Sequence, residues 1–204
     1  MKKGLLLVLS GPSGVGKGTI GAELLKNHSD MCFSVSATTR AMREGEAEGV
    51  NYFYKTTEEF ERMVEQDEFL EYMCVFGKNY YGTPRKYVDS KLNEGISVLL
   101  DIDVKGAMKV KEKMPEAVTV FIAPPSLAVL KNRLVGRGTE SEEAIARRLA
   151  ECKTEIGYIP RYDYVIINDA LDKAVADIEA ILTSVSLKSA NNTELADRLI
   201  NEEF

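Results

Sequence analysis

Short apolar runs alternate along the chain with longer segments of helical character, and this alternation predicts a sheet of buried strands connected by helices. The apolar runs have the length and content of strands buried on both faces, and they cover residues 5–9, 32–36, 96–103, 118–122 and 164–167. The helical segments carry apolar residues at helical spacing or have a helix-compatible composition, and they cover residues 17–25, 104–114, 127–134, 141–155 and 172–186. The pattern therefore favours an α/β fold.

One segment, residues 34–94, departs from this alternation. Its first part is polar and has no helical apolar stripe. Thr56 and Glu59 then have the spacing of a capping box at the start of a helix. The aromatic, turn-rich stretch 76–84 predicts a hairpin, and a short helix is expected directly after it. We interpret the whole segment as a small α+β excursion from the main sheet.

The turn between the first strand and the first helix has the spacing G-x-x-x-x-G-K of a phosphate-binding P-loop. Its residues are Gly11, Pro12, Ser13, Gly14, Val15, Gly16, Lys17, Gly18 and Thr19. Such a turn directs backbone N–H groups at one point beside the positive end of a helix dipole, and Lys17 adds a mobile charge. A chance glycine-rich turn is the alternative, but the strand, the helix and the lysine all agree with the motif.

Position 18 differs from many P-loops, because Gly18 stands where a Ser or Thr hydroxyl often binds magnesium. The hydroxyl arrives one residue later, on Thr19. We therefore expect Mg²⁺ to be held mainly by nucleotide oxygens, water and carboxylates elsewhere in the chain.

Length and composition limit the functions that the protein can have. The 204 residues suffice for one domain with insertions. The net charge of −6 argues against nonspecific nucleic-acid binding. No apolar run approaches a membrane span, and the run near the start is too short for a signal peptide. Three widely spaced cysteines lack metal-ligand spacing and fit reduced thiols in the cytoplasm. The single histidine, His28, lies in a polar turn, which argues against a histidine base.

Two arginines in the polar stretch, Arg40 and Arg43, lie near hydroxyls of Ser36, Thr39 and Tyr52. Two guanidinium groups with hydroxyls make a good site for a terminal phosphate. A solvated surface loop with incidental charges is an equal alternative from these residues alone.

Two further features gain meaning from the P-loop. Asp101 and Asp103 end an apolar strand, where P-loop enzymes place the carboxylate that orders magnesium through its water; Asp101 is preferred, and an ordinary strand end is the alternative. The window from Arg133 to Arg148 is rich in arginine, which suits a lid over phosphates. Ordinary surface ion pairs are the alternative.

Taken together, the stretches SGPSGVGKGT, SATTRAMREGEAEGVNYFY, EFLEY, NYYGTP, LLDIDVKGA, FIAPPS, LVGRGTESEEAIARRL and YDYVIINDALDKA resemble the guanylate kinase family over residues 4–188. The resemblance implies a P-loop fold of three α/β/α layers with a parallel central sheet, an inserted GMP-binding α+β subdomain and a mobile lid. The single domain would comprise a core (1–33, 95–135 and 158–190), a GMP-binding region (34–94), a lid (136–157) and a tail (191–204).

The family transfers the γ-phosphoryl group of ATP to GMP with Mg²⁺, giving ADP and GDP, and the resemblance implies a role for each matching residue. The GMP phosphate would be held by Ser36, Arg40, Arg43, Tyr52 and Tyr81. Guanine would be read by Glu71 and Thr83, because a carboxylate accepts from the two adjacent donors of guanine and offers adenine nothing equivalent. Asp101 and Asp103 would serve magnesium, its waters or the substrate.

The resemblance also implies an ATP side and a catalytic set. ATP would lie on residues 11–19, with Asn168 near adenine. The catalytic residues would be Lys17, Arg40, Arg133, Arg137 and Arg148. Gly18 departs from the common family pattern and puts the placement of magnesium in question. Thr83 stands where serine is common but keeps the hydroxyl.

Two other functions are weighed against this kinase. One is a phosphopeptide-binding module with the same fold, but such modules have damaged P-loops, whereas Gly11, Gly16 and Lys17 are intact. The other is a kinase for another small phosphate, against which Glu71 with Thr83 argues. The expected partners are ATP and GMP, without nucleic acid or membrane. The oligomeric state stays open, a homo-oligomer included.

Overall fold

The computed structural model describes residues 3–75, 77–136 and 142–202. Its main sheet has five strands in the order β2-β7-β1-β8-β9, and every pair is parallel. These strands are β1 (Leu6–Ser10), β2 (Met31–Phe33), β7 (Ser97–Asp101), β8 (Val118–Ala123) and β9 (Tyr164–Ile167). The predicted parallel sheet is thus confirmed, and the strand ahead of the P-loop lies at its centre.

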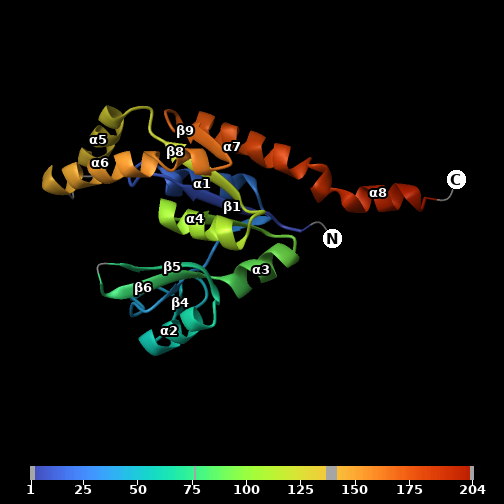
Figure 1. Cartoon of the computed structure of the whole chain (residues 1–204), viewed down its shortest axis with the longest axis horizontal. Coiled ribbons are helices and arrows are strands. Elements are labelled where there is room, and N and C mark those ends of the chain that lie inside the picture. The colour runs from blue at the N-terminus through green and yellow to red at the C-terminus, as the bar shows by residue number, and fades with distance from the viewer. Residues whose placement is uncertain (1–2, 76, 137–141, 203–204) are drawn as a thin grey trace.

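Helices cover both faces of this sheet (Figure 1). Successive residues of a strand point to opposite faces, so Leu7 and Leu9 pack beneath α1 (Lys17–Asn27) and α7 (Leu171–Ser186). Leu6 and Val8 pack beneath α3 (Arg85–Asn93) and α4 (Val104–Lys113). These four apolar side chains of β1 are at most 2% exposed. The three-layer α/β/α architecture follows directly from this burial on two sides.

A second sheet is inserted between β2 and β7, after the second strand of the chain. It has four strands in the order β4-β3-β6-β5, and β3 pairs parallel with β4 but antiparallel with β6. The elements are β3 (Ala37–Thr38), β4 (Phe53–Tyr54), α2 (Thr57–Glu65), β5 (Phe69–Val75) and β6 (Asn79–Pro84). Its small core centres on Phe60, whose ring stacks on Phe69 at 4.4 Å and on Tyr80 at 5.3 Å between centroids.

The capping box and the hairpin of this insertion are confirmed. Thr56 accepts from the Glu59 backbone N–H, and Glu59 accepts from the Thr56 backbone N–H. Strands β5 and β6 pair antiparallel, but the hairpin is longer than the predicted stretch 76–84, because its first strand is Phe69–Val75. The two-residue strands β3 and β4 were not expected, since the polar stretch around them has no strand pattern.

The remaining helices extend from the core. Helix α5 (Leu127–Val135) packs against α6 (Glu142–Ile156) through a separate apolar cluster that includes Leu130 and Cys152. The 3₁₀ turns Ile159–Arg161 and Ser189–Asn191 precede β9 and the last helix, α8 (Thr193–Ile200). Figure 1 shows α8 directed away from the body of the protein. Within the described residues, no helix combines the length and apolar character needed to cross a bilayer.

Candidate active site

The P-loop sits at the carboxyl edge of the central strand, between β1 and the first turn of α1. Gly16 has a φ of 99°, and a Cβ there would lie 2.5 Å from Asn168 Nδ2, so glycine is required at this position. Asn168 is 7% exposed, and its amide donates to the Val15 carbonyl at 2.8 Å. The loop shape is therefore supported by a residue that follows β9, the strand at the edge of the sheet.

Lys17 begins α1, and its side chain lies along the loop. The ammonium group donates to the carbonyls of Gly11 at 2.7 Å and Pro12 at 3.3 Å. Ser13, in the middle of the loop, is exposed and accepts a hydrogen bond from Arg148 Nη1 on α6. The loop, the lysine and an arginine of α6 are thus gathered at one point.

Glu71 and Thr83 face each other across the β5–β6 pair. The Thr83 hydroxyl donates to Glu71 Oε1 at 2.7 Å, and the two residues are only 1% and 7% exposed, respectively. Burial is the main cause that raises the pKa of the Glu71 carboxyl, while the Thr83 hydrogen bond opposes the rise. Helix α4 approaches so closely that a Cβ on Gly106 would lie 3.3 Å from Glu71 Oε2.

A β-bulge explains why Glu71 turns inward. The register of β5 against β6 shifts between Phe69 and Glu71. Phe69 then packs in the core of the insertion, and Leu70 packs against the main sheet. In a regular strand with one buried face, three consecutive buried residues would be unusual. The bulge allows Phe69, Leu70 and Glu71 to be buried in three different environments.

The predicted phosphate-binding residues of the insertion surround a pair of tyrosines. The rings of Tyr52 and Tyr81 meet edge to face at 5.9 Å, and the Arg40 guanidinium lies 5.3 Å from the Tyr52 centroid. Arg40 donates to both carboxylate oxygens of Glu46, at 2.7 and 3.0 Å. Arg43 is exposed. The loop around Arg40 is therefore organised rather than freely solvated.

The two aspartates that follow the apolar run of β7 differ in their surroundings. Asp103 caps α4, since its Oδ1 accepts from the Gly106 backbone N–H at 2.7 Å. Asp101 ends β7 and is open to solvent on one side, but desolvation by the surrounding protein still raises the pKa of its carboxyl, and Lys17 opposes this. A Cβ added to Gly18 would lie 3.4 Å from Asp101 Oδ2, so position 18 faces this carboxylate.

Three arginines were predicted to close on ATP, and two of them lie in the described part of the chain. Arg133 Nη2 donates to the carbonyls of Asn168 at 2.9 Å and Asp169 at 3.4 Å, which links α5 to the turn after β9. Arg148 reaches Ser13 of the P-loop. Arg137 lies outside the described residues.

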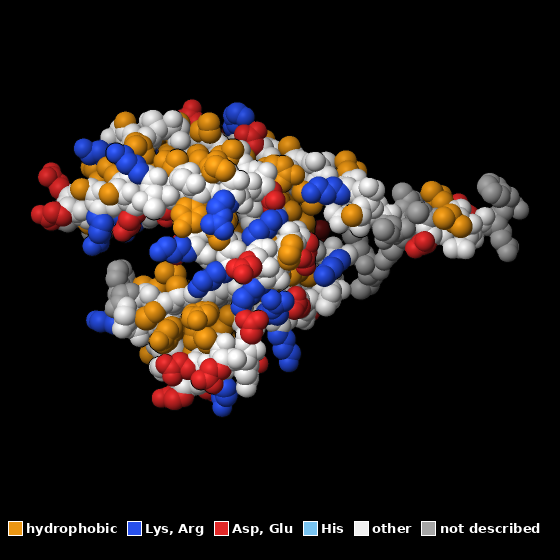
Figure 2. Space-filling model, viewed as in Figure 1, with side chains coloured by type: hydrophobic (Ala, Val, Ile, Leu, Met, Phe, Trp, Pro, Cys, Tyr) orange, Lys and Arg blue, Asp and Glu red, His pale blue; other side chains and the backbone are white. Residues whose placement is uncertain are grey.

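A cleft of about 360 Å³ brings the two halves of the predicted site together. Its lining includes residues of the P-loop, the end of β7, the inserted sheet and α6: Gly11, Ser13, Lys17, Ser36, Tyr52, Glu71, Tyr81, Asp101, Asp103 and Glu155. In Figure 2 the surface is hollowed between α5–α6 and the β5–β6 hairpin. A larger hollow of about 500 Å³ lies near Arg85 and Asp89 on α3 but contains none of the predicted residues.

Glu155 was not predicted, although it lines this cleft. Its carboxyl has a raised pKa, caused first by desolvation and opposed by Lys17. Nothing in the sequence distinguishes it from the other glutamates of α6, because only the packing of that helix turns it toward the P-loop. Glu46 was also missed, although an acidic residue close to two arginines in a polar loop is a usable signal.

A metal ion at this site would need most of its coordinating oxygens from the bound nucleotide and water. Among the residues that the structure describes, no three His, Cys, Asp or Glu side chains form a cluster able to hold a metal ion. Asp101 beside position 18 offers the hard oxygen donor that Mg²⁺ prefers, and nucleotide oxygens and water would complete its coordination.

Comparison with known proteins agrees with this geometry. A family model described as guanylate kinase matches residues 3–185. The chain belongs to the guanylate kinase family. It is 50% identical over 194 residues to the guanylate kinase of Caldanaerobacter subterraneus subsp. tengcongensis, a match covering 95% of this chain and 94% of that protein. It is 50% identical over 202 residues to the guanylate kinase of Halalkalibacterium halodurans, covering 99% and 98%.

A solved guanylate kinase supports the fold as well. The crystal structure of guanylate kinase from Anaplasma phagocytophilum matches with a TM-score of 0.72 and 36% sequence identity, covering 99% of this chain and 98% of that one. The resemblance inferred from the sequence is therefore confirmed, and the protein is an enzyme of the guanylate kinase family, a kinase.

Proposed function

We propose that the protein transfers the γ-phosphoryl group of ATP to GMP, giving ADP and GDP, in the cytoplasm and with Mg²⁺ bound to the nucleotide. The observation that carries the proposal is the cleft itself, since it holds Lys17 of the P-loop and the buried Glu71 in one space. Family membership and relatives named guanylate kinase at 50% identity support the same reaction. The product would serve purine nucleotide metabolism by recycling GMP.

The acceptor side of the cleft suits a guanine nucleotide. The Glu71 carboxylate would accept from N1–H and the 2-amino group of guanine. The Thr83 hydroxyl, which donates to Glu71 Oε1 in this structure, would turn to donate to O6 when guanine is bound. The GMP phosphate would lie among Ser36, Tyr52 and Tyr81, with Arg40 and Arg43 supplying charge. Residues 34–94 would then act as the GMP-binding region.

The donor side suits the phosphates of ATP. The N–H groups of residues 11–19 and the dipole of α1 would hold them, and Asn168 would lie near adenine. Lys17, Arg40, Arg133, Arg137 and Arg148 would offset the charge that brings two anions together, and residues 136–157 would move as a lid. Mg²⁺, reached by Asp101 through water, would supply further neutralisation of phosphate charge.

The chemistry needs no covalent intermediate and no dedicated base, because the GMP phosphate is already a nucleophile. Catalysis then consists of aligning donor and acceptor in line and excluding water from the transfer. The arginine contacts of α5 and α6 with the turn after β9 and with the P-loop support a role in this closure.

A coupled assay of ADP formation tests the proposal. The protein is supplied with ATP, Mg²⁺ and GMP, AMP, CMP or UMP in turn, and its folded state is checked by circular dichroism. We expect rapid ADP formation with GMP alone. A preference for another monophosphate would favour a different small-phosphate kinase, and no ADP formation by the folded protein would favour a binding module.

A further inference from the structure

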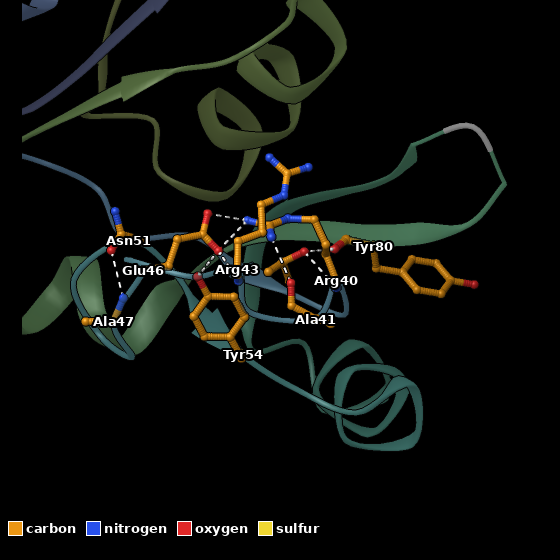
Figure 3. A network of polar contacts seen from close by, with 9 residues as sticks. Arg40, Ala41, Arg43, Glu46, Ala47, Asn51, Tyr54 and Tyr80 are labelled. Atoms are coloured by element: carbon orange, nitrogen blue, oxygen red, sulfur yellow. Dashed lines mark hydrogen bonds and ion pairs between the residues drawn. The ribbon is translucent and has the colours of Figure 1, made fainter.

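Glu46 lies at the centre of a hydrogen-bond network in the loop between β3 and β4 (Figure 3). Its carboxylate accepts from Arg40 Nη2 through both oxygens, at 2.7 and 3.0 Å. It also accepts from the Arg43 backbone N–H and from the Tyr54 hydroxyl, each at 2.8 Å. Four hydrogen bonds from three residues therefore fix this one side chain.

The network keeps Glu46 ionised. Its pKa is lowered to about 2, chiefly by the Arg40 hydrogen bond and next by the Arg43 backbone. The Arg40 and Glu46 side chains are only 13% and 19% exposed. A carboxylate with this low pKa stays charged at every pH at which a kinase is assayed.

Arg40 is fixed in turn. One of its terminal nitrogens is used by Glu46, and the other donates to the Ala41 carbonyl at 2.8 Å. The guanidinium lies over the ring of Tyr52 at 5.3 Å and near that of Tyr54 at 6.0 Å from the centroids. Tyr52 lines the cleft, so the arginine is held directly beside the proposed phosphate position.

We propose that Glu46 is a positioning residue for the acceptor phosphate. Glu46 holds the Arg40 guanidinium in the orientation in which it contacts the phosphate of GMP. This inference rests on the proposed function. A long arginine side chain that is already ordered loses less conformational freedom when a phosphate binds. The Arg43 N–H and the Tyr54 hydroxyl hold the Glu46 carboxylate independently of Arg40. Glu46 is therefore a fixed anchor for the guanidinium, which favours positioning over competition with the phosphate for Arg40.

The test compares Glu46→Gln with Glu48→Gln. Glu48 lies in the same loop and accepts from the Tyr54 backbone N–H at 2.9 Å, and it provides the matched control. For Glu46→Gln we expect the KM for GMP to rise about 10-fold, because a misoriented contact weakens binding on that scale. We expect kcat and the KM for ATP to change less than about 3-fold, and Glu48→Gln to match the wild type.

Guanosine, which lacks the phosphate, separates positioning from a general loosening of the loop. Its inhibition constant as a competitor of GMP should be the same for the wild type and Glu46→Gln. Tyr54→Phe removes a single donor to Glu46 and keeps the test available if Glu46→Gln folds poorly; we expect it to raise the KM for GMP about 2-fold. Thermal unfolding of each variant reports whether it is folded.

Three results would overturn the inference. Equal weakening of guanosine and GMP would make Glu46 a structural residue only. A lower KM for GMP in Glu46→Gln would make it a competitor of the phosphate, and an unchanged KM would remove it from the site. Each of these is read in an enzyme whose wild type phosphorylates GMP, whereas a wild type that fails to do so contradicts the proposed function itself.

Discussion

Among the single residues, the proposed selectivity for guanine depends on one buried carboxylate. Glu71 is 7% exposed, and its partner Thr83 donates to one of its oxygens. Burying a carboxylate costs stability, which fits a site that gives up stability for recognition. Because its folded pKa is raised, this cost is absent at pH values below the ordinary carboxyl pKa and develops as the pH rises through the raised value.

Glu71→Gln should reduce the preference for GMP over AMP by about 10- to 100-fold in kcat/KM. The amide replaces an acceptor with a donor that faces the donors of guanine, and a mispaired buried polar group costs selectivity on this scale. Steady-state kinetics with both nucleotides measure it. Glu94→Gln, on the surface of the turn after α3, is the control. An unchanged preference would remove Glu71 from the base site.

Titration of the Glu71 carboxyl should make the preference for GMP over AMP depend on pH. Its raised pKa means that Glu71 takes up a proton at a higher pH than an ordinary glutamate, and the protonated form accepts less well from guanine. The ratio of kcat/KM for GMP to that for AMP should therefore fall as the pH is lowered from 7 to 5. Titration of the substrate phosphate cancels in this ratio. Glu71→Gln should show a flat ratio, and an equally flat wild type would contradict the assignment.

Gly18 gives a second prediction at this scale. Serine fits there, since a Cβ would be in ordinary contact with Asp101 Oδ2 at 3.4 Å. Gly18→Ser should stabilise the protein by about 0.5 kcal/mol through helix propensity. It should also lower the Mg²⁺ concentration that gives half-maximal rate, because a hydroxyl now stands beside the carboxylate. Gly18→Ala raises helix propensity but adds no hydroxyl. It should therefore raise the unfolding temperature, as Gly18→Ser does, without lowering the Mg²⁺ concentration that gives half-maximal rate.

The sequence predicted single residues unevenly. The spacing of the motif alone predicted the P-loop residues, whereas Glu71 and Thr83 were predicted only through the family resemblance. Their meeting depends on the β-bulge after Phe69, and bulges leave no reliable pattern in one sequence. Glu155 enters the cleft through the packing of α6, which no local pattern reports.

At the element scale, the proposed phosphate site depends on how β1, α1 and the turn after β9 meet. The strand and helix of the P-loop were predicted within one or two residues, because their apolar content and the glycines at both turns are strong local signals. Strands β3 and β4 were missed, because a strand of two residues is too short to show an alternation of apolar and polar residues in the sequence.

Lys17→Ala tests the first turn of α1. The ammonium group lies on the loop that would hold ATP, so kcat should fall by about 10²- to 10³-fold, the scale seen when one preorganised charge donor is removed. The dissociation constant for GMP, measured by calorimetry, should change less than about 3-fold. Lys26→Ala, at the far end of the same helix and paired with Glu23, is the control. Equal loss of turnover and GMP binding would contradict the assigned role.

At the scale of the whole molecule, the cleft joins segments that are distant in the chain. Lys17, Glu71 and Glu155 line one space, although they belong to the P-loop, the inserted sheet and α6. Local patterns predicted an α/β fold, and the resemblance was needed to place Lys17 and Glu71 in one site. Neither predicted that Glu155 would join them. The net charge of −6 is compatible with the proposed binding of two anionic nucleotides, because Arg40 and Arg148 contact Tyr52 and Ser13 in the lining of this cleft.

A labelled phosphate tests whether the phosphoryl group passes from one nucleotide to the other. The protein is incubated with GMP, Mg²⁺ and ATP that carries radioactive phosphorus in its γ position, and the products are separated. The label should appear in GDP at the rate of ADP formation, with almost none in inorganic phosphate. Label released as inorganic phosphate, or retained in ATP while GMP is present in excess, would contradict this transfer.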